Sequence, residues 1–343
     1  MDRTAYLERA GAVLLDTRVA HFGDVSAEYG ALTHGCALLD VTADGRVDVA
    51  GADAPAFLQR LLTSNIKHVK PGHGTPAYLL TSTGKIALRL TLLRVDDIRY
   101  KVSVPAGLAA ALLPELDRYL FTERVELSPM EALQSLISVD GPLAPEVLRH
   151  AGLEPPEAPF EHAEGHLAGL PVRVARHDRL GAPAYDVHIP AADFEAAWGA
   201  LVGAGARPVG EAAAELVRIE RGVPAWGAEL TGEASPLEVT GLYGITEGKG
   251  CYPGQEVIER TLALGAPPRA LVRLQGEAEL RTGAPVSVVG TTDTEIGHVT
   301  SAATLPDGRH LALALVRRRF ATADEPLRCG NVPARRLDSH RVQ

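Results

Sequence analysis

The spacing of apolar and turn-forming residues changes near residue 265, and this change restricts the possible folds of the chain. Beyond this point, short apolar runs alternate with turns that contain glycine, proline and aspartate. The runs lie at 271–274, 285–289, 297–301 and 311–316. Short strands with such turns between them predict an all-β barrel at the C-terminal end. A chain of 343 residues also exceeds what one hydrophobic core usually covers, so we expect two or three domains.

A second unit is predicted over roughly residues 52–134. Residues 46–50 alternate polar and apolar, which indicates a half-buried strand, and Asp53 is expected to cap the helix that follows. Glycine and hydroxyl residues at 81–85 suit a hairpin turn between two strands. The alanine- and leucine-rich residues 106–120 predict a helix. Together these elements indicate a small α+β unit.

Composition argues against several classes of protein. The net charge of −9 does not provide the basic face of a nucleic-acid-binding protein, so we expect no direct nucleic-acid contact. No apolar run approaches the ~20 residues of a membrane span, and the N-terminal residues lack the apolar stretch of a signal peptide. Three widely spaced cysteines without a CxxC pair favour reduced thiols, and therefore a cytoplasmic location.

The run KGCYPGQE at 249–256 has the composition of a reactive-cysteine site. Glycines on either side of Lys249 let the backbone adopt positive φ angles or approach a ligand closely. A proline–glycine pair then turns the chain before a helix-forming segment. Cys251 is therefore expected near a helix N-terminus, where backbone dipoles favour a thiolate. Spacing alone leaves a second interpretation open, in which Cys251 is a small buried hydrophobic residue.

The same run resembles the signature of the YgfZ/GcvT superfamily, which contains the folate-binding YgfZ-like proteins and the T-protein of the glycine cleavage system. Other segments resemble elements of that family in the same order, so the resemblance covers about residues 20 to 320. These segments are DVT at 40–42, VAGADA at 49–54, RIERGVP at 218–224 and GHVTS at 297–301. On these motifs the chain is identified as a member of the superfamily.

The resemblance implies an α+β fold, a cloverleaf of three domains around a central channel. Residues 1–51 and 135–245 are expected to form a discontinuous first, folate-binding domain. Residues 52–134 are expected to form a ferredoxin-like second domain, and residues 246–343 the motif helix and a C-terminal β-barrel. The α+β unit and the β-rich tail that the residue patterns predict agree with this arrangement.

The resemblance also implies a cofactor, tetrahydrofolate or a one-carbon derivative, and offers two functions. T-proteins are aminomethyltransferases, whereas YgfZ-like proteins support assembly or repair of iron–sulfur clusters in client enzymes and use the motif cysteine. T-proteins carry an Asp–Asp pair shortly after a Gly–Gly at the hairpin where this chain has GKIALR at 84–89. Because no carboxylate stands there to polarise the folate, we expect an accessory protein with iron–sulfur enzymes or assembly proteins as partners.

Two alternatives to this accessory function remain. The first is a folate-dependent aminomethyltransferase, or another one-carbon transferase of the T-protein type. The second is a binding module that has lost folate and uses Cys251 for redox sensing or as a persulfide. Folate binding and one-carbon transfer are the properties that separate the three hypotheses.

Cys251 is the expected catalytic residue. The expected folate contacts are positions in the family motifs and two aromatic side chains that can stack on a pterin ring. They are Asp40, Tyr78, Arg218, Glu220, Trp226, Lys249, Gln255 and Glu256. Without the resemblance, Asp40 is more simply a turn cap, and each aromatic residue is as well explained by core packing. No metal site is expected, because His162 and His166 lie in a stretch with glycine and nearby prolines and without an HExxH motif.

Overall fold

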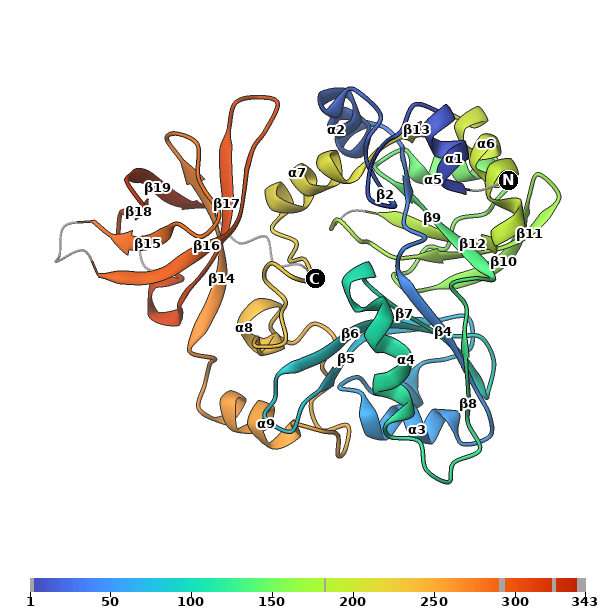
Figure 1. The fold of residues 1–343 in the computed structure, drawn as a ribbon. Helices are drawn as coiled ribbons and strands as arrows, with labels where there is room; N and C mark the ends of the chain where they lie inside the picture. Colours follow the sequence, from blue (N-terminus) through green and yellow to red (C-terminus); the bar gives the residue numbers. More distant parts are fainter. Residues whose placement is uncertain (1–2, 182, 290–293, 323–324, 338–343) are drawn as a thin grey trace.

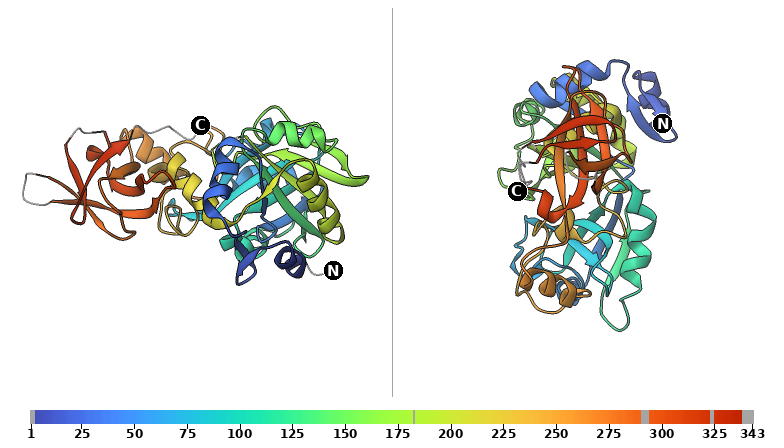
Figure 2. Two further views of the ribbon diagram at one scale, coloured as in Figure 1. Left: turned by 90° about the horizontal axis from the view of Figure 1, so that it is seen from above. Right: turned by 90° about the vertical axis from the view of Figure 1, so that its left-hand side faces the viewer.

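The computed structural model describes residues 3–181, 183–289, 294–322 and 325–337. The described residues form a six-stranded sheet, a five-stranded sheet, a closed barrel and a small hairpin of β1 (Val13–Leu15) and β2 (Arg18–His21). The two large sheets lie together on one side of the molecule, and the barrel lies on the other (Figure 1; Figure 2). Within this part of the chain, no helix is both long and apolar enough to cross a membrane.

The six-stranded sheet, called here the first sheet, has the strand order β10-β11-β12-β9-β3-β13. In chain order its strands are β3 (Ala37–Asp40), β9 (Gln134–Asp140), β10 (His162–Leu167), β11 (Leu170–Arg176), β12 (Ala184–Pro190) and β13 (Arg207–Pro208). Strand β13 pairs with β3 in parallel, and the other neighbours are antiparallel. Helices lie on both faces. They are α1 (Arg3–Arg9), α2 (Val25–His34), α5 (Ala144–His150), α6 (Phe194–Gly203) and α7 (Glu211–Arg221).

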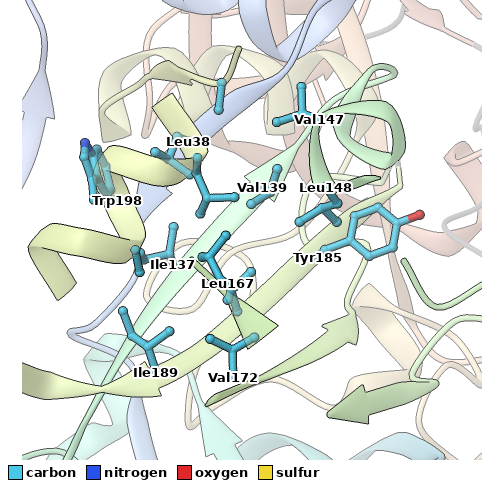
Figure 3. Close-up of a cluster of buried hydrophobic side chains, with 14 of the residues drawn as sticks. Leu38, Ile137, Val139, Val147, Leu148, Leu167, Val172, Tyr185, Ile189 and Trp198 are labelled. Atoms are coloured by element: carbon cyan, nitrogen blue, oxygen red, sulfur yellow. The ribbon is translucent and has the colours of Figure 1, made fainter. Parts of the chain in front are cut away.

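The two faces of the first sheet differ in polarity. Side chains alternate across a strand, so Ile137 and Val139 of β9 point to one face while Ser138 and Asp140 point to the other. The apolar face packs against α1, α5 and α6, where Trp198 is fully buried (Figure 3). Helices α2 and α7 cover only the β3 end of the opposite face. The polar part of that face is therefore left to contact the rest of the molecule.

The five-stranded antiparallel sheet, called here the second sheet, has the order β5-β6-β7-β4-β8. Its strands are β4 (Gly45–Ala50), β5 (Gly74–Leu80), β6 (Ile86–Arg94), β7 (Arg99–Val104) and β8 (Glu126–Pro129), and helices α3 (Ala54–Leu61) and α4 (Ala109–Asp117) pack on one face. Because β4 belongs to this sheet, the sheet begins before residue 52. The limits expected for the three domains stay a prediction.

The C-terminal strands close into a six-stranded barrel, as their pattern predicted. They are β14 (Arg269–Gly276), β15 (Pro285–Val288), β16 (Glu295–Thr304), β17 (His310–Arg317), β18 (Leu327–Cys329) and β19 (Val332–Leu337). Two short helices, α8 (Pro236–Val239) and α9 (Gln255–Ala263), precede the barrel. Among the described residues, four 3-10 turns lie at Ile66–His68, Ala106–Leu108, Ala191–Asp193 and Arg318–Phe320. Alternating apolar residues such as Leu274 and Val286 fill the barrel interior.

A buried polar network joins α7 to the barrel. Arg218 of α7 donates to Glu229 at 3.2 Å and to the Ser301 hydroxyl of β16 at 2.7 Å. Ser301 in turn donates to Glu229 at 2.6 Å, and the Ala225 amide donates to the same carboxylate at 3.0 Å. The Glu229 side chain is fully buried. A buried charge is tolerated when such partners surround it, so these contacts fix the barrel relative to α7.

We expect Glu229→Ala to lower the free energy of unfolding by about 2 kcal/mol, because Arg218 would lose its buried partner and keep only the half-exposed Glu215. Urea denaturation measures this change. Glu233→Ala is the matched control, since Glu233 is exposed on the same loop. An equal effect of the two substitutions would show that the network does not stabilise the junction.

Candidate functional site

A cavity of 360 Å³ lies where the first sheet, the second sheet and the end of α7 meet, and we call it the central cavity. Its walls come from residues far apart in the chain. They are Arg3 and 17–19 near the N-terminus, 39–41 and Asp140 of the first sheet, 89–91 of the second sheet, 223–226 after α7, and Tyr243. Ligand cavities of proteins usually measure about 300–1,000 Å³, so this one is large enough for a small molecule.

Strand alternation determines which side chains face the central cavity. On β6, Leu88 and Leu92 are buried in the core beneath α3 and α4, so Arg89 and Thr91 point the other way. On β9, Ile137 and Val139 belong to the apolar core of the first sheet, so Asp140 points to the opposite face. The cavity therefore lies between the polar faces of two sheets.

Three of the four carboxylates that line the central cavity are paired with arginines. The pairs are Asp40 with Arg3, Asp44 with Arg179 at 2.7 Å, and Glu211 with Arg18. Asp140 is the fourth. Among the described residues it has no ion pair, and only the Ser138 hydroxyl donates to it, at 3.0 Å.

Asp140 is an unusual carboxyl group for this position. Asp140 is 3% exposed, and burial raises the pKa of its carboxyl group to about 7. The nearby Asp186 carboxylate adds to the rise, whereas the Ser138 hydrogen bond and the charges of Arg179 and Arg221 oppose it. Near neutral pH, Asp140 is therefore divided between its protonated and ionised forms.

Arg89 lines the central cavity and forms no ion pair among the described residues. In the described part of the chain its one hydrogen bond is long, 3.4 Å from Nη1 to the Pro224 carbonyl. The other four arginines of the lining, Arg3, Arg18, Arg179 and Arg218, each form an ion pair. Arg89 ends the run GKIALR at 84–89, which contains no carboxylate. The side chain that β6 presents to the cavity there is a cation that cannot accept a proton.

Two aromatic side chains complete the lining. Trp226 packs beside Gly107, where an added Cβ atom would lie 2.8 Å from the indole ring, so the glycine makes room for the tryptophan. Tyr243 also lines the cavity, and burial raises the pKa of its hydroxyl to about 12, which keeps it neutral. Both rings offer surfaces on which a flat ligand can stack.

The structure brings three of the expected folate contacts to the central cavity: Asp40, Arg218 and Trp226. Tyr78 lies outside it, 1% exposed, with its hydroxyl 2.9 Å from the Thr240 hydroxyl. Glu220 is also outside the lining, where Tyr29 donates to it at 2.7 Å.

The remaining expected residues, Lys249, Cys251, Gln255 and Glu256, lie at a separate place that we call the motif segment (residues 246–256). Figure 1 shows α9, which follows this segment, beside the β5–β6 hairpin. The backbones touch there, since a Cβ atom on Gly254 would lie 2.5 Å from the Thr81 carbonyl. Cys251 is exposed, so its interpretation as a buried hydrophobic residue is wrong.

Lys249 is held by the second sheet's helix α3. Its ammonium donates to the Gln59 carbonyl and lies 4.9 Å from the centre of the Tyr252 ring, while Gln59 donates back to the Lys249 carbonyl at 3.0 Å. Burial lowers the pKa of Lys249 to about 8. Gln255 and Glu256 bond instead to Glu259 and Arg260 on their own helix. A second cavity, of 330 Å³, lies beside the motif segment, between residues 245–248 and α9.

No group of three His, Cys, Asp or Glu side chains within the described ranges could hold a metal ion. His162 and His166 lie on strand β10 rather than on a helix. His162 is engaged by the Arg94 carbonyl at 3.0 Å and by Arg173 at 2.8 Å, and burial lowers its pKa to about 4.

Sequence reasoning did not single out Asp140, Arg3 or Tyr243, and it noted Arg89 only as part of a run without a carboxylate. One signal was present for Asp140: the run SLISVD of residues 135–140 ends in a carboxylate on the same face as Ser138. The pairing that leaves Asp140 and Arg89 without charged partners joins residues far apart, so it could not be found from one sequence.

A family model described as the GCVT N-terminal domain matches residues 4–245, more than half of the chain. The chain belongs to the GCVT family. An aminomethyltransferase of Exiguobacterium sibiricum is 32% identical to this GCVT-family chain, over 93% of the chain and 89% of the relative. An aminomethyltransferase of Streptomyces avermitilis is 31% identical, over 86% of the chain and 82% of the relative.

A solved structure shares the fold of the GCVT-family chain. It is the glycine cleavage system aminomethyltransferase T from Bartonella henselae, which superposes with a TM-score of 0.87 at 23% identity. The match covers 98% of this chain and 95% of the other. The expected α+β fold of the T-protein type, with its C-terminal β-barrel, is confirmed.

The raised pKa of Asp140 has a consequence for stability. The folded chain binds this proton more tightly than the unfolded chain, so the carboxyl destabilises the fold increasingly as pH rises from about 4 through about 7. Asp140→Asn removes this titration. Relative to the unmodified protein, we expect the variant to gain about 2 kcal/mol in free energy of unfolding between about pH 5 and about pH 8.

Urea denaturation of both proteins at several pH values measures the difference. Asp117→Asn is the matched control, since Asp117 is exposed at the end of α4. A constant difference for Asp140→Asn would mean that Asp140 titrates normally.

Proposed function

We propose that this GCVT-family chain binds a tetrahydrofolate, or a one-carbon derivative of it, in the central cavity and acts as a one-carbon transferase of the aminomethyltransferase type. The observation that carries the proposal is the meeting of Asp40, Arg218 and Trp226 around one cavity of 360 Å³. The motifs at 40–42 and 218–224 are distant in the chain, yet both contribute a wall. Relatives that match most of the chain are named aminomethyltransferases, which supports the activity.

The chemistry of the cavity suits a reduced folate. The bound folate would supply the nitrogen atoms that carry the one-carbon unit. Trp226 and Tyr243 provide stacking surfaces for its flat pterin and aminobenzoyl groups. Sheets on two sides and the N-terminal residues on a third would exclude water from a bound ligand, which strengthens every polar contact made inside.

A second function, that of a YgfZ-like accessory protein for iron–sulfur enzymes, is favoured by two specific observations. Arg89 stands in the cavity wall on the segment where a T-protein carboxylate is expected, and a guanidinium cannot act as a general base. Cys251 is exposed on the motif segment and does not line the central cavity, so it is accessible to a protein partner. Under this function, folate is bound without aminomethyl transfer, in the cytoplasm.

Tryptophan fluorescence provides a direct test of folate binding. The chain has two tryptophans, and Trp198 is buried in the core of the first sheet, so we expect added tetrahydrofolate to quench Trp226. The variant Trp198→Phe should keep this quenching and Trp226→Phe should lose it. Absence of binding in both fluorescence and calorimetry would contradict both functions.

An aminomethyl-transfer assay then separates the two functions. Measurable aminomethyl transfer to tetrahydrofolate would support the transferase function and contradict the accessory function. Binding without transfer supports the accessory protein, and in that case Cys251→Ala should fail to restore iron–sulfur enzyme activity in cells that lack this protein. Full restoration by Cys251→Ala would remove the thiol from the mechanism.

A further inference from the structure

Two charged groups that line the central cavity, Asp140 and Arg89, have no oppositely charged partner among the described residues. Buried charges are costly unless they are paired, and most charges of this lining obey that rule. Within the described residues, Asp140 is the carboxylate and Arg89 the arginine of the lining that lack an oppositely charged partner. A carboxyl group and a guanidinium cation without charged partners in the walls of one cavity indicate a ligand that carries complementary groups.

The two groups project from different sheets. Asp140 is the last residue of β9 in the first sheet, and Arg89 lies in the middle of β6 in the second sheet. Each side chain is on the face opposite its own apolar core. A ligand that fills the cavity therefore meets Asp140 on one wall and Arg89 on another.

Asp140 is a hydrogen-bond acceptor with free positions, because each oxygen of an ionised carboxylate can accept two hydrogen bonds. Ser138, two residues earlier on the same face of β9, donates to one carboxylate oxygen. In the described structure no protein donor reaches the other oxygen, and Asp140 is only 3% exposed. Asp140 lines the central cavity, so an N–H group of a ligand can donate to this oxygen.

We propose that Asp140 and Arg89 set the orientation of the ligand: Asp140 accepts from an N–H edge, and Arg89 binds a carboxylate at the other end. This assignment rests on the proposed function. In a tetrahydrofolate, the pterin ring presents an amino group beside a ring N–H, the donor pair that a carboxylate accepts. The glutamate tail presents the carboxylates that a guanidinium binds with paired hydrogen bonds.

The assignment makes binding depend on pH. Asp140 accepts two N–H groups only when ionised, so affinity should rise as pH increases through the pKa of about 7. The groups that face this carboxyl are Ser138 on its own strand, Asp186 on β12, Arg179 before β12, Arg221 on α7 and the Cys36 thiol before β3. Asp186 is held ionised by Arg179 and His177, despite its burial, so Asp140 is the carboxyl that titrates in this range.

Two ligands distinguish the two contacts. Tetrahydrofolate carries both the pterin edge and the glutamate carboxylates, whereas 6-methyltetrahydropterin carries the pterin edge alone. We expect Asp140→Asn to weaken both ligands by about 10- to 100-fold at about pH 8, and Arg89→Met to weaken tetrahydrofolate alone by a similar factor. Calorimetric titration measures each affinity. Asp117→Asn and Arg99→Met, which alter exposed residues of α4 and β7, are the matched controls.

A third variant tests the Asp140 contact without removing its carboxyl. Ser138→Ala removes the hydrogen bond that lowers the pKa of Asp140, so the pH at which affinity for 6-methyltetrahydropterin rises should move upward. Unchanged affinities in Asp140→Asn and Arg89→Met, with normal binding by the unmodified protein, would overturn this assignment and leave the proposed function intact. Absence of binding by the unmodified protein would overturn both.

Discussion

The two faces of the first sheet differ in polarity, and this difference determines what can pack against each face. One face is apolar and is covered by α1, α5 and α6. The other carries Ser138, Asp140 and Asp186 within a buried environment, and an apolar helix face would leave these groups without partners. The second sheet and the end of α7 lie over that face instead, while Arg179 and His177, which precede β12, pair with Asp186. The central cavity remains between these layers.

The junction between α7 and the barrel contributes to the cavity as well as to stability. Residues 223–226, which form one cavity wall, connect Arg218 to Glu229 along the chain. The same two side chains are joined through space, and Ser301 of the barrel bonds to both. Arg218 therefore has two roles: it faces the cavity and it holds the loop that carries Trp226. A substitution of Arg218 would alter both, which makes Trp226 and Asp140 the clearer positions for binding studies.

Local patterns predicted much of the fold, because they depend on neighbours in the chain. The turns after residue 265 predicted the barrel, and glycine with hydroxyl residues at 81–85 predicted the β5–β6 hairpin. The structure differs in detail where tertiary contacts compete. Asp53 begins α3 as expected, but its carboxylate makes no cap hydrogen bond and binds Arg124 instead.

The site was less predictable, for a physical reason. Asp40 pairs with Arg3 and Asp44 pairs with Arg179, so whether a cavity charge is neutralised depends on residues brought together only by the fold. The resemblance placed residues of the motif segment among the folate contacts; this segment lies beside the β5–β6 hairpin and does not line the central cavity. The chain thus has two separate places at which chemistry can occur, a cavity for a small molecule and an exposed thiol.

Hydrogen–deuterium exchange with and without tetrahydrofolate distinguishes binding in the central cavity from binding at the motif segment, because it reports on both regions at once. If folate binds in the central cavity, amides of residues 39–41, 89–91 and 223–226 should exchange more slowly with ligand present, while those of 246–256 should not change. Slower exchange confined to 246–256, or unchanged exchange throughout the chain, would contradict folate binding in the central cavity.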